Sequence, residues 1–332
     1  MKSFENGTAL QIRRIDLPTP FPVGPVNAYL IREADQAVLV DCGPGTESAR
    51  EELTRQLAQE GLVPQDLSAV LLTHGHVDHV GQASWLQSLG VPVLAPRHVD
   101  TWLQPEGQFA AYRREFFSRL YDVQGVPSAE VERSVRELAA LNGFVRPATV
   151  DITLEYGATC PVLPQFTVIH VPGHAQHAMG LWNAATGELI SGDQLLPHIS
   201  SNAFIEPELG ARRGQEATRT ESLIQYRNNL AQLMNLNIST VYPGHGPVFQ
   251  HAQQLIQRRL DEQEQRLEEF LDRLRHHGSV SAYELAVDYF PRHTQQTSLI
   301  MSETLGYLDW IKGLGEVEED EENSVVTWIK SS

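Results

Sequence analysis

Apolar runs of strand length alternate with helical patterns over the first 250 residues. Before residue 100 these runs lie at 10–12, 26–31, 37–40, 67–72 and 91–95. The first two are separated by Pro and Gly, which predicts antiparallel strands. A helical pattern follows over 46–60, with Thr46 at its cap position. The succession of strand, helix and strand predicts helices layered on a sheet.

The pattern resumes after residue 149. Strands are predicted at 150–154, 166–171, 180–183, 188–191 and 238–242, and the third and fourth of these form a hairpin around Thr186 and Gly187. An amphipathic helix is predicted over 215–236 and another helix over 81–89. These elements complete an α/β catalytic domain over residues 1–250.

Two stretches break this rhythm. Residues 97–147 are helical and aromatic, and aromatic residues at helical spacing more often pack in a core. The functional interpretation is a helical cap over the metals that shapes a substrate pocket, and the two interpretations are compatible. After residue 250 the chain predicts a charged helix over 251–276, helices at 282–289 and 298–313, and a strand at 324–329. We interpret 251–332 as a small winged-helix-like domain that ends in a hairpin.

Composition and charge narrow the classes of partner. The chain has 332 residues, 41% of them hydrophobic, and a formal net charge of −17. Residues 251–332 hold 8 Lys and Arg against 16 Asp and Glu. This balance disfavours nucleic acid and anionic membranes as partners. The last 82 residues are then expected to serve packing or a homodimer, and the substrate is expected to be a small molecule.

The cysteines and lysines add two constraints. Cys42 and Cys160 form no CxxC pair, which favours reduced thiols in a cytoplasmic protein; one disulfide is the alternative. No signal peptide or membrane-spanning run is evident near Met1 or elsewhere. Lysine occurs only at positions 2, 312 and 330. An anionic substrate group must therefore meet Arg, a metal ion or backbone N–H.

One motif concentrates metal-binding side chains. His74, His76, Asp78 and His79 follow the predicted strand at 67–72. Side chains at i, i+2, i+4 and i+5 cannot all point one way from a strand or helix, so we expect a loop that wraps a metal. Because Asp78 and His79 are adjacent, they are expected to serve a different ion from His74 and His76. The alternative is a His-rich surface turn that binds metal loosely.

Other candidate residues follow predicted strands. His174, after Pro172 and Gly173, is expected to join the first metal. Asp193 is expected to bridge the two ions, and His245 to complete the second site. Weaker candidates are Asp41, interpreted as an orienting residue rather than a ligand; His177, as an orienting residue or substrate contact; and Arg212 and Arg213, near the pocket.

Together these motifs resemble the metallo-beta-lactamase superfamily. The matching segments are 73–79, 172–174, 192–193 and 243–246, in the family's order. The resemblance implies a four-layer αββα sandwich with two metals at one edge. His74, His76 and His174 would hold one ion, Asp78, His79 and His245 the other, and Asp193 would bridge them. The end of the chain resembles the branch of lactamase-beta-like protein 2.

The resemblance implies two divalent ions, with zinc expected first and iron or manganese as alternatives. The main hypothesis is a hydrolase in which a metal-bridging hydroxide attacks a small ester, thioester or lactone. Asp78 or Asp193 would hold the proton and return it to the leaving group. The alternatives are a phosphodiesterase or endoribonuclease, a mononuclear iron dioxygenase of the persulfide-oxidising kind, and a non-catalytic metal-binding interaction protein.

Overall fold

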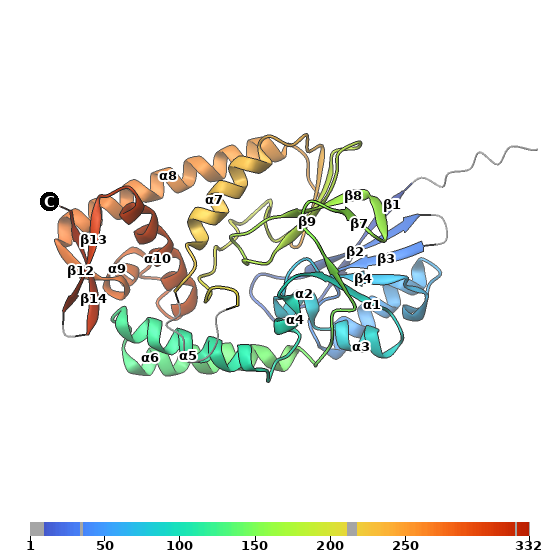
Figure 1. Cartoon of the computed structure of the whole chain (residues 1–332), viewed down its shortest axis with the longest axis horizontal. Coiled ribbons are helices and arrows are strands. Elements are labelled where there is room, and N and C mark those ends of the chain that lie inside the picture. The colour runs from blue at the N-terminus through green and yellow to red at the C-terminus, as the bar shows by residue number, and fades with distance from the viewer. Residues whose placement is uncertain (1–9, 34–35, 211–217, 323, 332) are drawn as a thin grey trace, which may run out of the picture.

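The computed structural model describes residues 10–33, 36–210, 218–322 and 324–331, and the first sheet within them holds six strands (Figure 1). Their spatial order equals their sequence order: β1 (Gln11–Leu17), β2 (Val26–Glu33), β3 (Gln36–Val40), β4 (Ala69–Leu71), β5 (Val93–Pro96) and β6 (Ile152–Leu154). The pairs from β1 to β3 are antiparallel and those from β3 to β6 are parallel. The predicted strands of this region are confirmed.

A second sheet holds five strands in the order β11-β10-β9-β8-β7. They are β7 (Thr159–Cys160), β8 (Leu163–His170), β9 (Met179–Asn183), β10 (Glu188–Gly192) and β11 (Thr240–Pro243). β9 and β10 form the predicted antiparallel hairpin, and β10 pairs in parallel with β11. β7 was not predicted, because two residues carry no periodic signal.

The two sheets pack face to face, with helices outside both. Along β2, Tyr29 and Ile31 join the core between the sheets, whereas Leu30 joins a second core beneath the helices. This alternation follows from the two-residue period of a strand. The helices over the first sheet are α1 (Glu47–Gln59), α2 (Val77–Val80) and α3 (Ala83–Ser88), with a short 3₁₀ turn at Pro64–Asp66. As predicted, Thr46 caps α1.

Helices α7 (Ser222–Leu233) and α8 (Ala252–His277) belong to the outer layer of the second sheet. Leu189 and Val241 share a buried cluster with Tyr226 and Leu230 of α7 and with Ile256 of α8. The molecule therefore has the four-layer αββα architecture that the resemblance implied. α7 begins at Ser222, later than predicted.

The predicted helical insertion consists of α4 (Val99–Trp102), α5 (Gln108–Val123) and α6 (Ser128–Leu141), followed by a 3₁₀ turn at Asn142–Phe144. Figure 1 shows α5 and α6, in green, running from the sandwich to the C-terminal elements. Phe116 and Leu120 of α5 share a buried cluster with residues of that C-terminal part. Core packing thus accounts for one part of the insertion's aromatic pattern.

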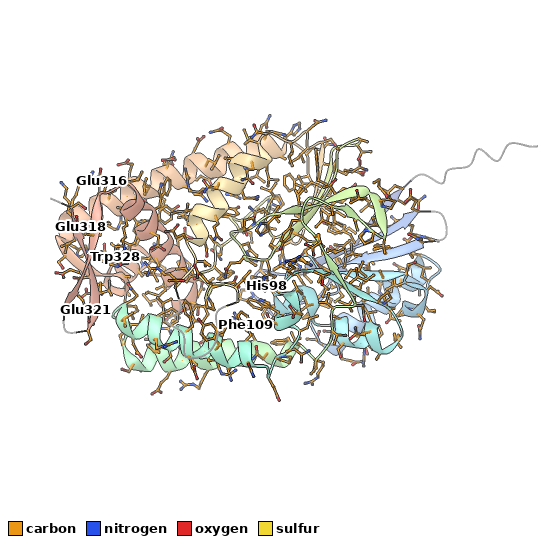
Figure 2. All side chains as sticks on the ribbon, in the orientation of Figure 1. His98, Phe109, Glu316, Glu318, Glu321 and Trp328 are labelled. Carbon is orange, nitrogen blue, oxygen red and sulfur yellow. The ribbon has the colours of Figure 1, made fainter. Side chains whose placement is uncertain are left out.

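After α8 come β12 (Ser279–Ser281), α9 (Ala282–Tyr289), α10 (Thr297–Gly313), β13 (Val317–Glu322) and β14 (Val325–Lys330). The three strands form one antiparallel sheet around a fully buried Trp328. Figure 2 shows Glu316, Glu318 and Glu321 at this end of the molecule. The helices and the hairpin are confirmed. The winged-helix comparison and the boundary at residue 250 remain predictions.

The structure adds a helical turn inside the metal motif. The helix expected over 81–89 is present as α3, and a separate short helix, α2, begins at Val77 within the motif. Asp78 and His79 therefore lie on one helical turn rather than on a loop, and the His79 N–H donates to the carbonyl of His76. This turn points the adjacent side chains in different directions, because successive residues of a helix are about 100° apart.

Candidate metal centre

The candidate ligands lie where strands of both sheets end. His74 follows β4, His174 follows β8, Asp193 follows β10 and His245 follows β11. β8 and β11 are each parallel to β10 through the pairings of the second sheet, so their carboxyl ends meet at one edge. The fold therefore gathers residues that are up to 171 positions apart in the sequence.

Potential ligand atoms form three groups, each within 4.8 Å: His74, His76 and His174; His74, His79 and Asp193; and Asp78, His79 and His245. The first and third are the sets that the resemblance assigned to two ions. The Asp193 carboxylate lies 3.4 Å from His79 Nε2, 3.5 Å from His174 Nε2 and 3.6 Å from His245 Nε2. Asp193 thus reaches both sets, as a bridging ligand must.

Hydrogen bonds orient two of the imidazoles through backbone carbonyls. His174 Nδ1 lies 2.9 Å from the carbonyl of Asn202, and His245 Nδ1 lies 2.8 Å from the carbonyl of Pro25. A carbonyl oxygen only accepts, so Nδ1 of each ring carries the hydrogen. In the neutral ring the lone pair is therefore on Nε2, which faces the other candidate ligands.

Asp41 orients two more imidazoles. Its Oδ2 lies 2.8 Å from His79 Nδ1 and accepts a hydrogen bond of 2.8 Å from Thr73 Oγ1. Because that hydroxyl hydrogen is used, Thr73 Oγ1 accepts from His74 Nδ1 at 3.0 Å. The Nε2 lone pairs of His74 and His79 are again left for a ligand. Asp41 thus occupies the position of an orienting residue, and its role in the reaction stays a prediction.

Buried polar atoms test whether the site fits metal ions. Nε2 of His74, Nε2 of His79 and Oδ1 of Asp193 are buried and have no hydrogen-bond partner among the described residues. An unsatisfied buried polar atom is costly, about 1–3 kcal/mol. All three atoms are lone-pair donors within the groups above. Divalent cations would satisfy them, so the residues fit a two-metal site.

The pKa shifts keep His74, His76 and Asp193 in the metal-binding form and hold a proton on His79, which a cation would replace. Burial and neighbouring imidazoles hold the pKa of His74 and His76 well below the usual value, which keeps both rings neutral. Burial raises the pKa of Asp193, but the imidazoles of His79 and His245 outweigh burial and hold it below the usual value. Burial lowers the pKa of His79, yet surrounding carboxylates raise it well above normal. The same negative field attracts cations.

His177 contacts the segment that carries His74 and His76. Its Nε2 accepts a hydrogen bond of 2.8 Å from the Gly75 N–H, and its ring lies 5.3 Å from that of Trp102. Burial lowers the pKa of His177 to about 3, so the ring is neutral. Gly75 admits this arrangement because a Cβ there would lie 2.4 Å from Trp102. These contacts suit an orienting residue rather than a substrate contact.

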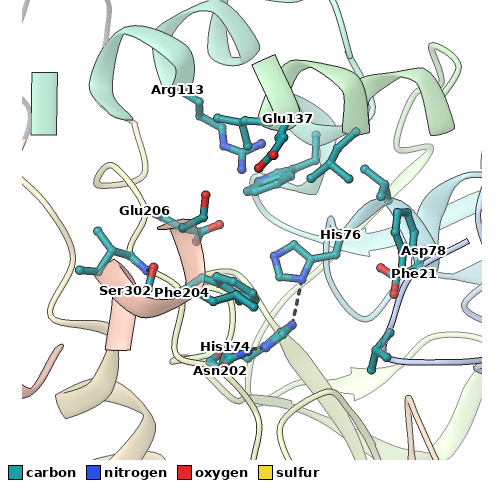
Figure 3. Close-up of a pocket in the computed structure, with 18 of the residues that line it drawn as sticks. Phe21, His76, Asp78, Arg113, Glu137, His174, Asn202, Phe204, Glu206 and Ser302 are labelled. Atoms are coloured by element: carbon teal, nitrogen blue, oxygen red, sulfur yellow. Dashed lines mark hydrogen bonds between the residues drawn. The ribbon is translucent and has the colours of Figure 1, made fainter. Parts of the chain in front are cut away.

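The candidate ligands open on a cavity of about 820 Å³. His76, Asp78, His174, Asp193 and His245 lie in its wall, and the insertion and α10 supply its far side. Figure 3 shows His76 and His174 facing one another beside Phe204, with Arg113 and Glu206 farther away. The cavity is mainly apolar and aromatic; such residues include Phe21, Trp102, Phe109, Phe117, Leu138, Phe204 and Leu299.

Sequence reasoning missed several residues of this cavity. Trp102 lies in the aromatic stretch of residues 97–147, but neither it nor Asn202, Phe204 and Glu206 was singled out. Their segments carry no ligand motif, and only the fold brings them into the cavity wall that contains His174 and His76. Arg212 and Arg213 lie outside the described residues.

The sequence model of the metallo-beta-lactamase superfamily matches residues 21–245. The chain belongs to the metallo-beta-lactamase superfamily. It is 31% identical to the probable metallo-hydrolase YqjP of Bacillus subtilis, over 91% of this chain and 92% of that protein. It is 26% identical to an atrochrysone carboxyl ACP thioesterase of Aspergillus fumigatus, over 72% of this chain and 56% of the thioesterase.

The solved structures show the same architecture. A metallo-beta-lactamase family protein from Thermus thermophilus, TTHA1429, superposes with a TM-score of 0.80 at 27% identity. The match covers 96% of this chain and 98% of that chain, so it includes the insertion and the C-terminal elements. The chain is thus a metallo-hydrolase of this superfamily with a candidate His/Asp metal cluster. No helix among the described residues has the length and apolarity to span a bilayer.

Proposed function

We propose that this chain is a dinuclear metal hydrolase that cleaves an ester, thioester or lactone of a small, largely apolar molecule. One observation carries the proposal. Four imidazoles, each with Nδ1 hydrogen-bonded to the surrounding protein, direct Nε2 toward the carboxylates of Asp78 and Asp193 at the wall of an apolar cavity. The four rings are those of His74, His79, His174 and His245. His74, His76 and His174 would hold one divalent cation, and Asp78, His79 and His245 the other, with Asp193 shared between them.

When bound, such cations would activate a water molecule and polarise the oxygen of the scissile bond. The side chains would order the remaining chemistry. Asp78 Oδ2 lies 3.4 Å from His245 Nε2, and Asp78 and Asp193 both line the cavity. Either carboxylate can hold the proton of the attacking water and pass it to the leaving group. Both have lowered pKa values, so each accepts a proton only transiently.

The cavity wall supports an acyl substrate. Phe21, Phe109, Phe117 and Leu299 would bury apolar carbon atoms, while the reacting bond lies against His76 and His174. The similarity to a fungal ACP thioesterase is consistent with thioester chemistry. A phosphodiester polymer is less suitable, because the described cavity wall contains a single arginine and no lysine.

Metal content and turnover test this function together. The purified protein is expected to hold two equivalents of zinc, iron or manganese, and to hydrolyse at least one member of a panel of esters, thioesters, lactones and phosphodiesters. His76→Ala should abolish turnover, whereas His276→Ala, an exposed histidine of α8, should not. Equal inertness of wild type and His76→Ala across the panel would favour the non-catalytic interaction protein.

The same measurements separate the remaining alternatives. Turnover confined to the phosphodiester would favour the phosphodiesterase or endoribonuclease hypothesis. One tightly held iron together with oxygen consumption on a persulfide would favour the dioxygenase. We propose further that 1–250 is the catalytic domain and that 251–332 supports packing or a homodimer, because its acidic surface disfavours nucleic acid.

A further inference from the structure

Arg113 is the one fixed cation that the described residues place in the cavity wall. It comes from α5, and Figure 3 shows its guanidinium directed into the cavity. The other charged groups of that wall are the carboxylates of Asp78, Glu137, Asp193 and Glu206. An arginine in a mainly apolar cavity needs a reason, because desolvating a charged group is costly.

One nitrogen of the guanidinium lacks a hydrogen bond. Arg113 Nε is buried and has no hydrogen-bond partner among the described residues. Instead its central carbon lies 3.9 Å from the centre of the Trp102 ring. Such a stack holds the plane of the guanidinium and leaves the N–H groups at its edge available. Burial lowers the pKa of Arg113 to about 10, so it stays charged at neutral pH.

Trp102 also connects Arg113 to the reaction centre. The other neighbours of Trp102 include His76, whose ring centre lies 5.6 Å from that of Trp102. Arg113 and the candidate ligand His76 therefore contact the same indole ring and line the same cavity. An acyl group with its carbonyl at the metal end would reach Arg113 with its other end.

We propose that Arg113 binds a carboxylate at the far end of the acyl group, so that the preferred substrates are esters or thioesters of short dicarboxylic acids. The inference rests on the proposed hydrolase function. A carboxylate would accept two N–H groups of the guanidinium fork, the geometry in which arginine binds this group best. With lysine absent between positions 2 and 312, arginine is the cation available for this task.

Glu206 is a buried carboxylate in the same cavity wall as Arg113. It is 2% exposed, and one of its oxygens accepts hydrogen bonds from the backbone and side chain of Gln176. Its other oxygen, Oε1, has no hydrogen-bond partner among the described residues. Burial raises the pKa of Glu206, while the field of Arg113 lowers it, and the net shift is upward. The carboxylate therefore neutralises Arg113 only in part and at a distance.

Matched esters test the proposal on the full-length, metal-loaded protein. The 4-nitrophenyl half-esters of glutaric, adipic and suberic acid are compared with the esters of pentanoic, hexanoic and octanoic acid. The measured quantity is the ratio of kcat/KM between members of each pair. Arg113→Gln should lower that ratio about 10- to 100-fold at the best chain length and leave the neutral ester nearly unchanged. Arg119→Gln, an exposed arginine of the same helix, should keep the wild-type ratio.

The outcomes are distinct. Equal losses on both esters in Arg113→Gln would mean that Arg113 only holds Trp102 in place, and the proposal is wrong. An unchanged ratio would also overturn it. If Arg113→Gln melts early, Arg113→Met replaces it, because methionine keeps an unbranched stem over the ring.

If the wild-type protein cleaves none of these esters, binding decides instead. Calorimetry with adipamic acid, which has one carboxylate and one neutral amide, compares wild type, Arg113→Gln and Arg119→Gln. Weaker binding by Arg113→Gln alone would support the carboxylate site while the hydrolase function fails. Equal binding by all three proteins, or none, would reject the carboxylate site.

Discussion

The two ends of the cavity are built in opposite ways. At the metal end, His74, His79, His174 and His245 each have a ring nitrogen fixed by a hydrogen bond to the surrounding protein. At the far end, apolar side chains from α5, α6 and the segment around α10 surround one stacked arginine. At the first end, hydrogen bonds fix the orientation of these four rings and leave ligand atoms for cations, whereas the second end offers charge and space to a substrate.

This difference separates reaction from selectivity. A reaction centre tolerates little displacement, so its ligands are held from outside by Asp41, Thr73 and backbone carbonyls. A binding surface can change its wall without losing the chemistry. Substitutions at the metal end should therefore act on turnover of every substrate, and substitutions at the far end should act on the choice among substrates.

The largest effect is expected from His79→Ala. This change removes the imidazole between Asp41 and Asp193 and takes a ligand from two of the three groups. Activity should fall at least about 1,000-fold, since a metal contributes several kcal/mol to the barrier. Metal content by mass spectrometry should fall with it, whereas His276→Ala should change neither. Full activity of a His79→Ala protein with little bound metal would contradict the assignment of the metal end as the reaction centre.

Asp41→Asn should have the next largest effect. The Asp41 carboxylate accepts hydrogen bonds from the Thr73 N–H, the Thr73 hydroxyl and His79 Nδ1. An asparagine amide has one accepting oxygen instead of two, so His79 and, through Thr73, His74 lose part of their orientation. The expected loss is about 10- to 100-fold in activity or metal affinity, and it should be equal for all substrates. A metal-affinity titration measures it, with Asp272→Asn on the exposed side of α8 as control. A loss confined to one substrate would contradict the assignment.

The contribution of His177 to the free energy of unfolding should depend on pH. Its pKa is about 3 in the folded protein against an ordinary value of 6.5, so the unfolded chain binds the extra proton between these values. Stability from this group is complete above pH 6.5 and falls by about 1.4 kcal/mol per pH unit down to pH 3. Urea unfolding of wild type and His177→Gln should therefore converge as pH falls. Parallel lines would show that His177 has the same pKa in the folded and the unfolded chain.

The smallest effect is expected at the apolar wall. Phe117 lines the cavity and is 9% exposed. Phe117→Leu should enlarge the cavity and shift the preference toward longer acyl groups by about two- to fivefold, at a stability cost of about 1 kcal/mol. Relative kcat/KM over a series of acyl lengths measures this shift. A uniform drop in turnover over the whole series would place Phe117 in the support of the metal end.

The elements that the sequence predicted correctly are those with local signals. The strand pattern before residue 100 and the Thr46 cap were predicted because both signals are local. The helix predicted over 81–89 is α3, whereas the turn that begins at Val77 was missed because four residues are too short for a periodic signal. The fold brings together the segments that carry the candidate ligands, which adjacent histidines and strand-end carboxylates make conspicuous in the sequence.

By itself the sequence determined the layered α/β fold, the candidate ligand types and the scarcity of lysine, because each is a property of short segments or of composition. Tertiary structure alone decided which nitrogen of each imidazole is available, since Pro25, Asn202 and Asp41 reach the rings from distant parts of the chain. It also decided that Arg113 faces a cavity and stacks on Trp102. Such facts depend on long-range packing, which no local pattern encodes.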